Sequence, residues 1–168
     1  MEGIGEPRSA DSYVAQVQTR LERAGYSWTG DAGASFRAVA RTSSFQVTKF
    51  GFWDVFFVFR EFQRLDSGSM QTFMREALQH ALANRGVKLP RGLFAGVAVF
   101  GVALADEVDE ATVRAVREET PPKHWASAEI PVVYDARARR IHYFEKTPVW
   151  GAAYYKGYRK QIEQLLAP

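Results

Sequence analysis

The sequence predicts an α+β domain in which helices pack on a mostly antiparallel sheet. Segments with apolar residues at helical spacing are interspersed with shorter segments of alternating or continuous apolar residues. Apolar residues make up 46% of the 168 residues and aromatic residues 14%, which is enough for a sizeable core in one domain. Together these patterns predict the element order α-β-β-β-α-β-α-β-β-α.

The N-terminal residues 1–9 are expected to form a loose tail, because they carry glycine and proline and have little to bury. Residues 10–168 are expected to form the domain. Its first helix is predicted from about Asp11 to Ala24, with apolar residues along one face, and Gly25 is well placed to end it. A loop of small residues follows at 30–33.

Three strands are predicted next, at residues 36–41, 45–50 and 53–59. The first two alternate apolar and polar residues, and a turn is expected between them at 42–44. The third is apolar on both faces except for Asp54, which is typical of a central strand covered on both sides. An antiparallel meander of three strands is therefore expected.

The second helix has the clearest periodicity in the chain. It is predicted to begin near Ser67 or Ser69 and to end at Gly86. A buried strand with small residues follows at 92–103, and these small residues would allow a helix to approach closely. A shorter helix capped by Asp109 comes next and ends at a proline pair.

The C-terminal part of the chain is predicted to be a hairpin followed by a helix. The hairpin consists of strands at 130–134 and 140–144 with a polar turn between them. The helix is predicted from about Gly151 to Leu166. The apolar face of this helix is expected to contain Tyr154, Tyr158, Ile162 and Leu165.

Composition excludes several classes of protein. The chain contains no cysteine, so disulfides, thiolate metal sites and cysteine nucleophiles are excluded. Its longest apolar run, 93–105, is shorter than the roughly 20 residues of a membrane-spanning helix, and its N-terminus is not a signal peptide. We therefore expect a cytoplasmic protein without membrane insertion. A net charge of +3 and a pI of about 9.3 are mildly basic, which permits an anionic partner.

The hairpin and last helix form the strongest candidate binding surface, because basic and aromatic residues gather there. The candidate residues are Arg137, Arg139, Arg140, Trp150, Lys156, Arg159 and Lys160. One interpretation is a surface for a protein, an anionic ligand or a nucleic acid. The other is an ordinary amphipathic helix with a solvated basic face, in which Trp150 seats the helix on the sheet.

The histidines do not show the spacing of a metal-binding motif, and no metal or cofactor is predicted. One arrangement for catalysis remains open if the fold brings its members together. In it, His142 would act as a base and Asp135 or Glu145 would orient it.

The predicted order of elements over residues 11–103, a helix, three strands, a helix and a strand, resembles that of the PD-(D/E)XK nucleases. In that family a strand carboxylate and a nearby acid-x-Lys hold a divalent metal. The resemblance implies Asp54, Glu61 and Gln63 as the corresponding residues, and the lysine is missing. The strand order is also similar to that of type III secretion chaperones, which bind partners without catalysis, although this chain has an additional helix at 109–118.

The sequence thus favours a non-catalytic binding domain that uses the hairpin and last helix to bind a protein or anionic partner. A metal-dependent nuclease-like hydrolase is the alternative. Nucleic-acid binding without cleavage is a third hypothesis.

Overall fold

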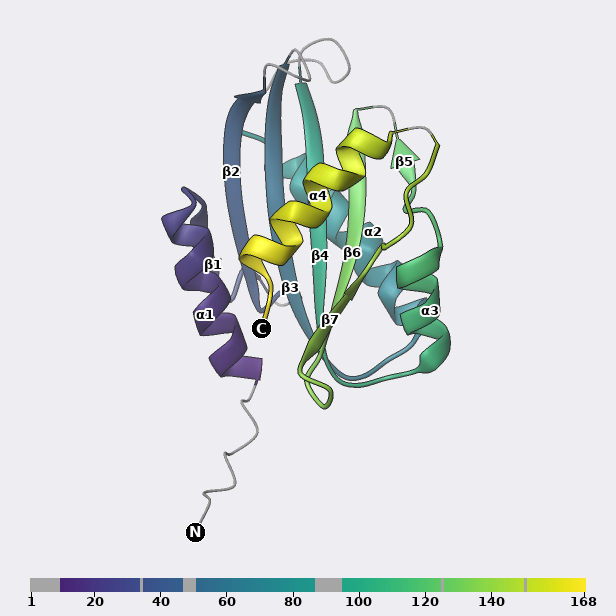
Figure 1. Ribbon diagram of the computed structural model, residues 1–168. Coiled ribbons are helices and arrows are strands. Elements are labelled where there is room, and N and C mark those ends of the chain that lie inside the picture. The colour runs from purple at the N-terminus through teal and green to yellow at the C-terminus, as the bar shows by residue number, and fades with distance from the viewer. Residues whose placement is uncertain (1–9, 34, 47–50, 87–94, 125, 150) are drawn as a thin grey trace.

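The computed structural model describes residues 10–33, 35–46, 51–86, 95–124, 126–149 and 151–168 (Figure 1). Two long strands rich in valine, phenylalanine and alanine, β3 (Gly51–Leu65) and β4 (Ala95–Val108), form the centre of the sheet. They run parallel, and β4 also pairs in parallel with β6 (Ser127–Asp135). Parallel neighbours need a crossover. Here, helices α2 (Ser67–Ala83) and α3 (Glu110–Glu118) provide the two crossovers.

Antiparallel strands extend the sheet on both sides. On one side, β2 (Ala38–Gln46) pairs with β3, and β1 (Ser27–Gly30) pairs with β2. On the other side, β5 (Lys123–His124) and β7 (Arg140–Tyr143) both pair with β6. Among the described residues, four of the six strand pairings are antiparallel, which confirms the predicted mostly antiparallel α+β fold.

The meander differs from the prediction in where its strands lie. Residues 38–46 form the single strand β2, and the turn predicted at 42–44 is absent because these residues pair with Val55, Asp54 and Trp53 of β3. The third strand is instead β1, which begins before the predicted loop. The order of the larger elements agrees with the sequence prediction, and the two-residue β5 is additional.

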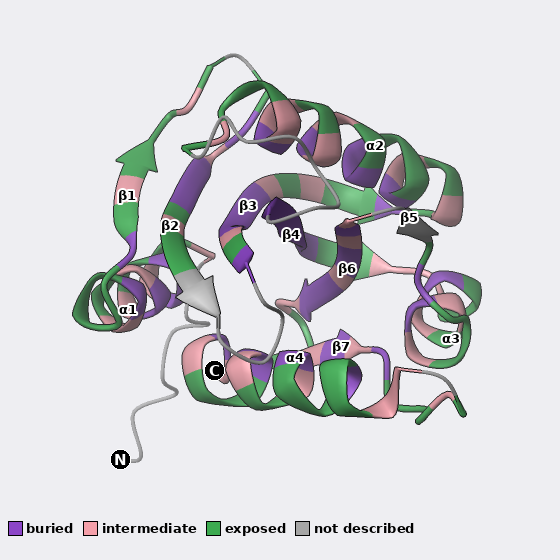
Figure 2. Ribbon diagram, turned by 90° about the horizontal axis from the view of Figure 1, so that it is seen from above, coloured by how far each residue is buried: buried purple, intermediate pink, exposed green. Residues whose placement is uncertain are grey.

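Helices cover both faces of the sheet (Figure 2). Helix α2 packs on one face, and α3 lies on the same side beside β6 and β7. Helices α1 (Ala10–Arg23) and α4 (Ala152–Leu165) pack on the opposite face. The strands predicted to be buried, the third and fourth in the predicted order, correspond to β3 and β4. Their burial is confirmed, because both contribute side chains to the hydrophobic cores on the two faces of the sheet.

Helix α1 is tied to the C-terminal end of the chain. The ring of Tyr13 stacks on Tyr134 at 3.7 Å, and its hydroxyl donates a hydrogen bond of 2.6 Å to the carbonyl oxygen of Leu166. The start and the end of the domain are therefore held on the same face of the sheet. Within the described residues, none of the helices combines the length and the apolar character needed to cross a membrane.

The buried face of α4 is turned slightly from the predicted one. Tyr158 and Ile162 are buried as expected, whereas Tyr154 is 47% exposed and Tyr155 and Leu166 are buried. Gly151, whose φ of 86° lies in the left-handed region, is the residue at which the helix begins. The prediction of Tyr154 on the apolar face is wrong, because packing on the sheet buries Tyr155 in its place.

Candidate functional site: two pockets on either side of α3

The predicted basic surface is divided between the two faces of the sheet. Along β7, Arg140 and His142 face α3, whereas Ile141 and Tyr143 pack toward the core beneath α4. The exposed Lys156 and Lys160 lie on α4. The structure therefore places Arg140 on the face of the sheet opposite the one that α4, with Lys156 and Lys160, covers.

Two of the predicted basic residues have structural partners. Arg137 forms an ion pair with Glu107. Arg159 donates hydrogen bonds to the connection between β7 and α4, at 2.8 Å to the carbonyl oxygen of Glu145 and 3.1 Å to the Thr147 hydroxyl. These contacts hold the hairpin and the final helix in place.

The remaining members of that surface are Arg139 and Trp150. Arg139 is exposed, with a positive φ of 51° in the hairpin turn, and Trp150 lies outside the described residues. Beside it, Val149 is 93% exposed, and Tyr154 is exposed one turn into α4. A protein partner at this end of α4 stays a prediction.

The carboxylates of the nuclease hypothesis do not meet. Asp54 is buried and accepts a hydrogen bond from Ser43, whereas Glu61 is half exposed and paired with Arg37 at 3.1 Å. The two acids are seven residues apart on β3, so they lie roughly 23 Å apart along the strand and on opposite faces. Gln63 is exposed near the far end of that strand. Among the described residues, no cluster of three or more His, Cys, Asp or Glu could hold a metal ion.

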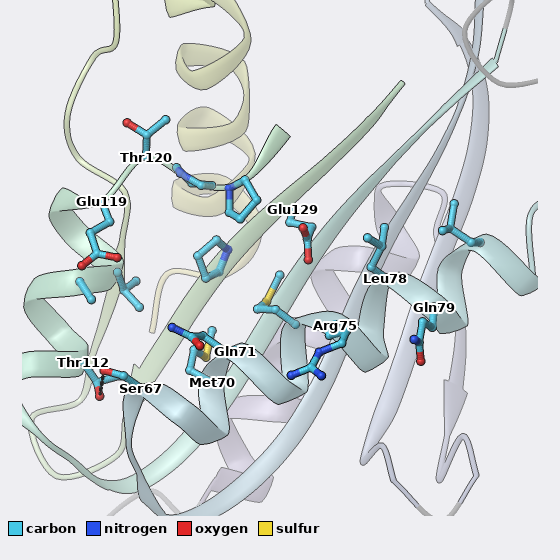
Figure 3. A pocket seen from close by; sticks show the side chains of 17 residues that line it. Ser67, Met70, Gln71, Arg75, Leu78, Gln79, Thr112, Glu119, Thr120 and Glu129 are labelled. Carbon is cyan, nitrogen blue, oxygen red and sulfur yellow. Dashed lines mark hydrogen bonds between the residues drawn. The ribbon is translucent and has the colours of Figure 1, made fainter. Parts of the chain in front are cut away.

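Helices α2 and α3 begin side by side because β3 and β4 are parallel and end in register. Asp66 caps α2 by accepting from the Ser69 amide at 2.7 Å, and Asp109 caps α3 by accepting from the Thr112 amide at 2.6 Å. The hydroxyls of Ser67 and Thr112 share a hydrogen bond of 3.1 Å between the two helices. From this contact the helices diverge, as Figure 3 shows. A groove that is closed at one end results.

This groove is a pocket of about 600 Å³, which we call the α2–α3 pocket. Its sides are the two helices, residues 119–122 and strand β6. The apolar side chains that line it are Met70, Met74, Leu78, Leu82, Ala115, Val116, Pro121, Pro122 and Pro131. Leu78 and Leu82 belong to the predicted apolar face of α2 but are only half-buried, because they border this pocket.

Three charged residues line the α2–α3 pocket and come from different elements: Arg75, Glu119 and Glu129 (Figure 3). Glu129 of β6 is 7% exposed and has an interaction of its own, and Glu119, the C-cap of α3, is exposed. Arg75 of α2 is exposed, and within the described part of the chain it forms no ion pair or hydrogen bond. The pocket therefore combines an apolar interior with one available guanidinium group and the exposed carboxylate of Glu119.

A second pocket, which we call the α3–β7 pocket, lies on the other side of α3 and has a volume of about 360 Å³. It is lined by Val108, Glu110, Val113, Arg114, Arg117, Glu118, Asp135, Ala138, Arg140 and His142. His142 is buried, and its Nε2 lies 3.8 Å from Asp135 Oδ2. Burial lowers the pKa of His142, and the nearby Arg140 lowers it further, while Asp135 acts in the opposite direction.

The fold therefore brings together part of the predicted base arrangement. Asp135 lies near His142, but the distance of 3.8 Å is too long for a direct hydrogen bond. Glu145 is paired instead with Arg117 at 2.7 Å. Neither pocket was predicted from the sequence, because each depends on the separation of elements that are distant along the chain.

The chain matches no family model, and neither a curated protein nor a solved structure matches it at a significant level. The likeness to nucleases and to secretion chaperones is thus one of element order alone. Functional conclusions depend on the chemistry of the two pockets.

Proposed function

We propose that this protein is a binding domain without catalysis of its own and that its α2–α3 pocket takes up an apolar small molecule carrying one anionic group. The observation that carries this proposal is the apolar pocket of about 600 Å³ with Arg75 beside it, which has no ion-pair partner among the described residues. Pockets for small molecules have volumes of roughly 300–1,000 Å³ and place a few polar groups in an apolar lining.

The apolar lining supports the first part of this ligand's description. Leu78 and Leu82 are left half-buried by the fold, so an apolar ligand would remove their remaining surface from water. Each methylene group of the ligand that is buried there contributes about 0.8 kcal/mol. Met70 and Met74 border the same space, and methionine side chains adapt readily to the shape of a bound molecule.

The charge of Arg75 supports the second part. A guanidinium group binds a carboxylate through two parallel hydrogen bonds, and such charge-assisted bonds are stronger than neutral ones. Of the two acids in the lining, Glu129 has an interaction of its own, and Glu119 is exposed to water, which weakens its repulsion of a bound anion. The hydrogen bond between Ser67 and Thr112 joins the two helices beside the pocket, and the volume of about 600 Å³ suits a compact ligand.

Calorimetric titration with straight-chain alkanoates from hexanoate to tetradecanoate tests the proposal. Affinity should rise by about fourfold per methylene until the pocket is full, and the alcohol of equal length should bind more weakly. Replacing Arg75 by glutamine should weaken alkanoate binding by about tenfold and leave alcohol binding unchanged. Arg23→Gln, an exposed change on the opposite face of the sheet, is the matched control.

A second pair of variants tests the location. Ala115→Leu places extra volume in the pocket from α3 and should shorten the longest alkanoate that binds. Ala111→Leu makes the same change one turn earlier, at an exposed position that lines neither pocket, and should have no effect. Absence of alkanoate binding, or binding that is insensitive to both Arg75→Gln and Ala115→Leu, would overturn the proposal.

A further inference from the structure

The α3–β7 pocket contains polar atoms that the protein itself leaves unsatisfied. Among the described residues, the buried side-chain atoms without a hydrogen-bond partner are Arg117 Nε, Ser127 Oγ and His142 Nδ1. Two of the three, Arg117 Nε and His142 Nδ1, belong to residues that line this pocket. Buried polar groups in proteins nearly always have a partner, so unsatisfied ones that share a pocket indicate a missing partner there.

The pocket also contains guanidinium groups that are available to a ligand. Arg114 of α3 and Arg140 of β7 line it, are exposed, and form no ion pair with the part of the chain that the structure describes. Arg117 uses Nη2 to bind Glu145, which leaves its Nε for another acceptor.

The acidic residues of the pocket are largely occupied. Asp135 accepts a hydrogen bond of 2.9 Å from the Ala138 amide with Oδ1, and its Oδ2 faces His142. Glu118 pairs with Lys146 at 3.7 Å. Of the acids in the lining, only Glu110 forms no ion pair with another described residue. The pocket therefore has more available positive than negative groups.

We propose that the α3–β7 pocket binds a phosphate monoester, with the guanidinium groups of Arg114, Arg117 and Arg140 around the phosphate and the imidazole of His142 as a further donor. Guanidinium groups match the geometry of phosphate oxygens. The volume of about 360 Å³ far exceeds the share of roughly 30 Å³ that one water takes in the liquid. It leaves room for an organic group attached to the phosphate.

The state of His142 changes when an anion binds. Without ligand, burial and Arg140 favour the neutral ring, and a proton on Nε2 facing Asp135 leaves Nδ1 without a donor. The charges already around the ring come from Arg140 on β7, Asp135 on β6, and Glu110, Arg114, Arg117 and Glu118 on α3. A bound phosphate adds negative charge to this set. The ring then gains a proton and Nδ1 donates to a phosphate oxygen. Binding therefore raises the pKa of His142.

Two measurements test the proposal on the full chain. Calorimetric titration compares glycerol phosphate, as the monoester, with inorganic phosphate in chloride buffers of equal ionic strength. Proton NMR follows the titration of the His142 ring with and without glycerol phosphate. We expect the monoester to bind more tightly than inorganic phosphate and the pKa of His142 to rise.

Single substitutions assign the site. Arg140→Gln and Arg114→Gln remove exposed cations from two different elements, and each should weaken monoester binding by about tenfold or more. Arg137→Gln is the matched control, because it lies on the same hairpin but pairs with Glu107 outside the pocket lining, and it should change affinity less than threefold. Ala115→Leu, which narrows the α2–α3 pocket, should leave the affinity for the monoester unchanged. The two proposals are therefore tested independently of each other.

Several results would overturn the proposal. Absence of monoester binding is one, and an unchanged pKa of His142 at saturation is another. Equal affinity for inorganic phosphate would assign the site to the free anion instead of a monoester. Equal losses for Arg140→Gln and Arg137→Gln would indicate nonspecific attraction to a basic surface.

Discussion

Helix α2 packs so closely on β4 at Gly101 that replacing this glycine tests the contact between them. A Cβ atom at this position in β4 would lie 2.2 Å from Met74 Sδ, 3.1 Å from Met74 Cε and 3.3 Å from Phe73 Cε1. Heavy atoms in contact normally lie about 3.5–4.0 Å apart, so the Met74 sulfur would have to retreat by roughly 1.5 Å. Gly101→Ala thus forces Met74 toward the α2–α3 pocket that it borders.

The expected cost follows from two opposing contributions. Overpacking a core with one extra carbon costs about 1–3 kcal/mol, and alanine is favoured over glycine within a strand by roughly 0.5–1 kcal/mol. We therefore expect Gly101→Ala to lower the free energy of unfolding by about 1–2 kcal/mol. For a domain of this size each kcal/mol lowers Tm by roughly 2–4 °C.

Urea denaturation of four proteins isolates the contact: the wild type, Gly101→Ala, Met74→Ala and the double variant. Met74→Ala alone should cost about 2–3 kcal/mol, near the low end for such truncations, because the side chain borders open space. In the double variant the new methyl group no longer meets the sulfur, so the loss should be smaller than the sum by at least about 1 kcal/mol. Additivity within about 0.5 kcal/mol would refute the contact.

Gly157→Ala is the matched control. A Cβ atom at this position in α4 would have no neighbour within 4 Å. Alanine is also favoured over glycine in a helix, so this change should stabilise the protein by roughly 0.5–1 kcal/mol. If Gly157→Ala also destabilised the protein, the loss of stability in Gly101→Ala could not be attributed to its contact with Met74.

Two further predictions concern tyrosines. Tyr13→Phe removes the buried hydrogen bond to the Leu166 carbonyl and should lower the free energy of unfolding in urea by about 1 kcal/mol. Tyr143→Phe removes an exposed hydrogen bond to Glu163 and should lower it by less. Equal losses in the two variants would contradict this prediction. Burial raises the pKa of Tyr26 and Tyr158 to about 12, so above about pH 10 the unfolded chain releases these protons first. Stability should therefore fall between about pH 10 and 12, and tyrosinate absorbance of the folded protein should lag behind that in urea; coincident titrations would contradict it.

The fold class and most elements could be predicted from the sequence because their signals are local. Helix α2 repeats its apolar residues at the helical period, and the C-terminal hairpin has a polar turn between two apolar strands. The small residues of β4 indicated a close helix approach, which Gly101 confirms beneath α2. These features depend on residues that are neighbours in the chain or one helical turn apart.

Strand boundaries were less predictable because pairing partners are distant in sequence. The polar run from Thr42 to Ser44 is typical of a turn, yet it continues β2 because β3 offers a ladder partner for each residue and Asp54 for the Ser43 hydroxyl. Likewise, the apolar spacing of α4 predicted Tyr154 on its packed face, where the structure has Tyr155. Packing against the sheet, which the sequence alone does not show, buries Tyr155.

By itself, then, the sequence determined an α+β domain with a mildly basic charge and an ample core. Only the tertiary structure decided where its basic and apolar groups gather. Strand alternation turns Arg140 and His142 toward α3 and away from the lysines of α4, which divides the predicted surface. The α2–α3 pocket exists because parallel strands start both helices at one edge, from which they diverge and leave apolar side chains that neither helix covers.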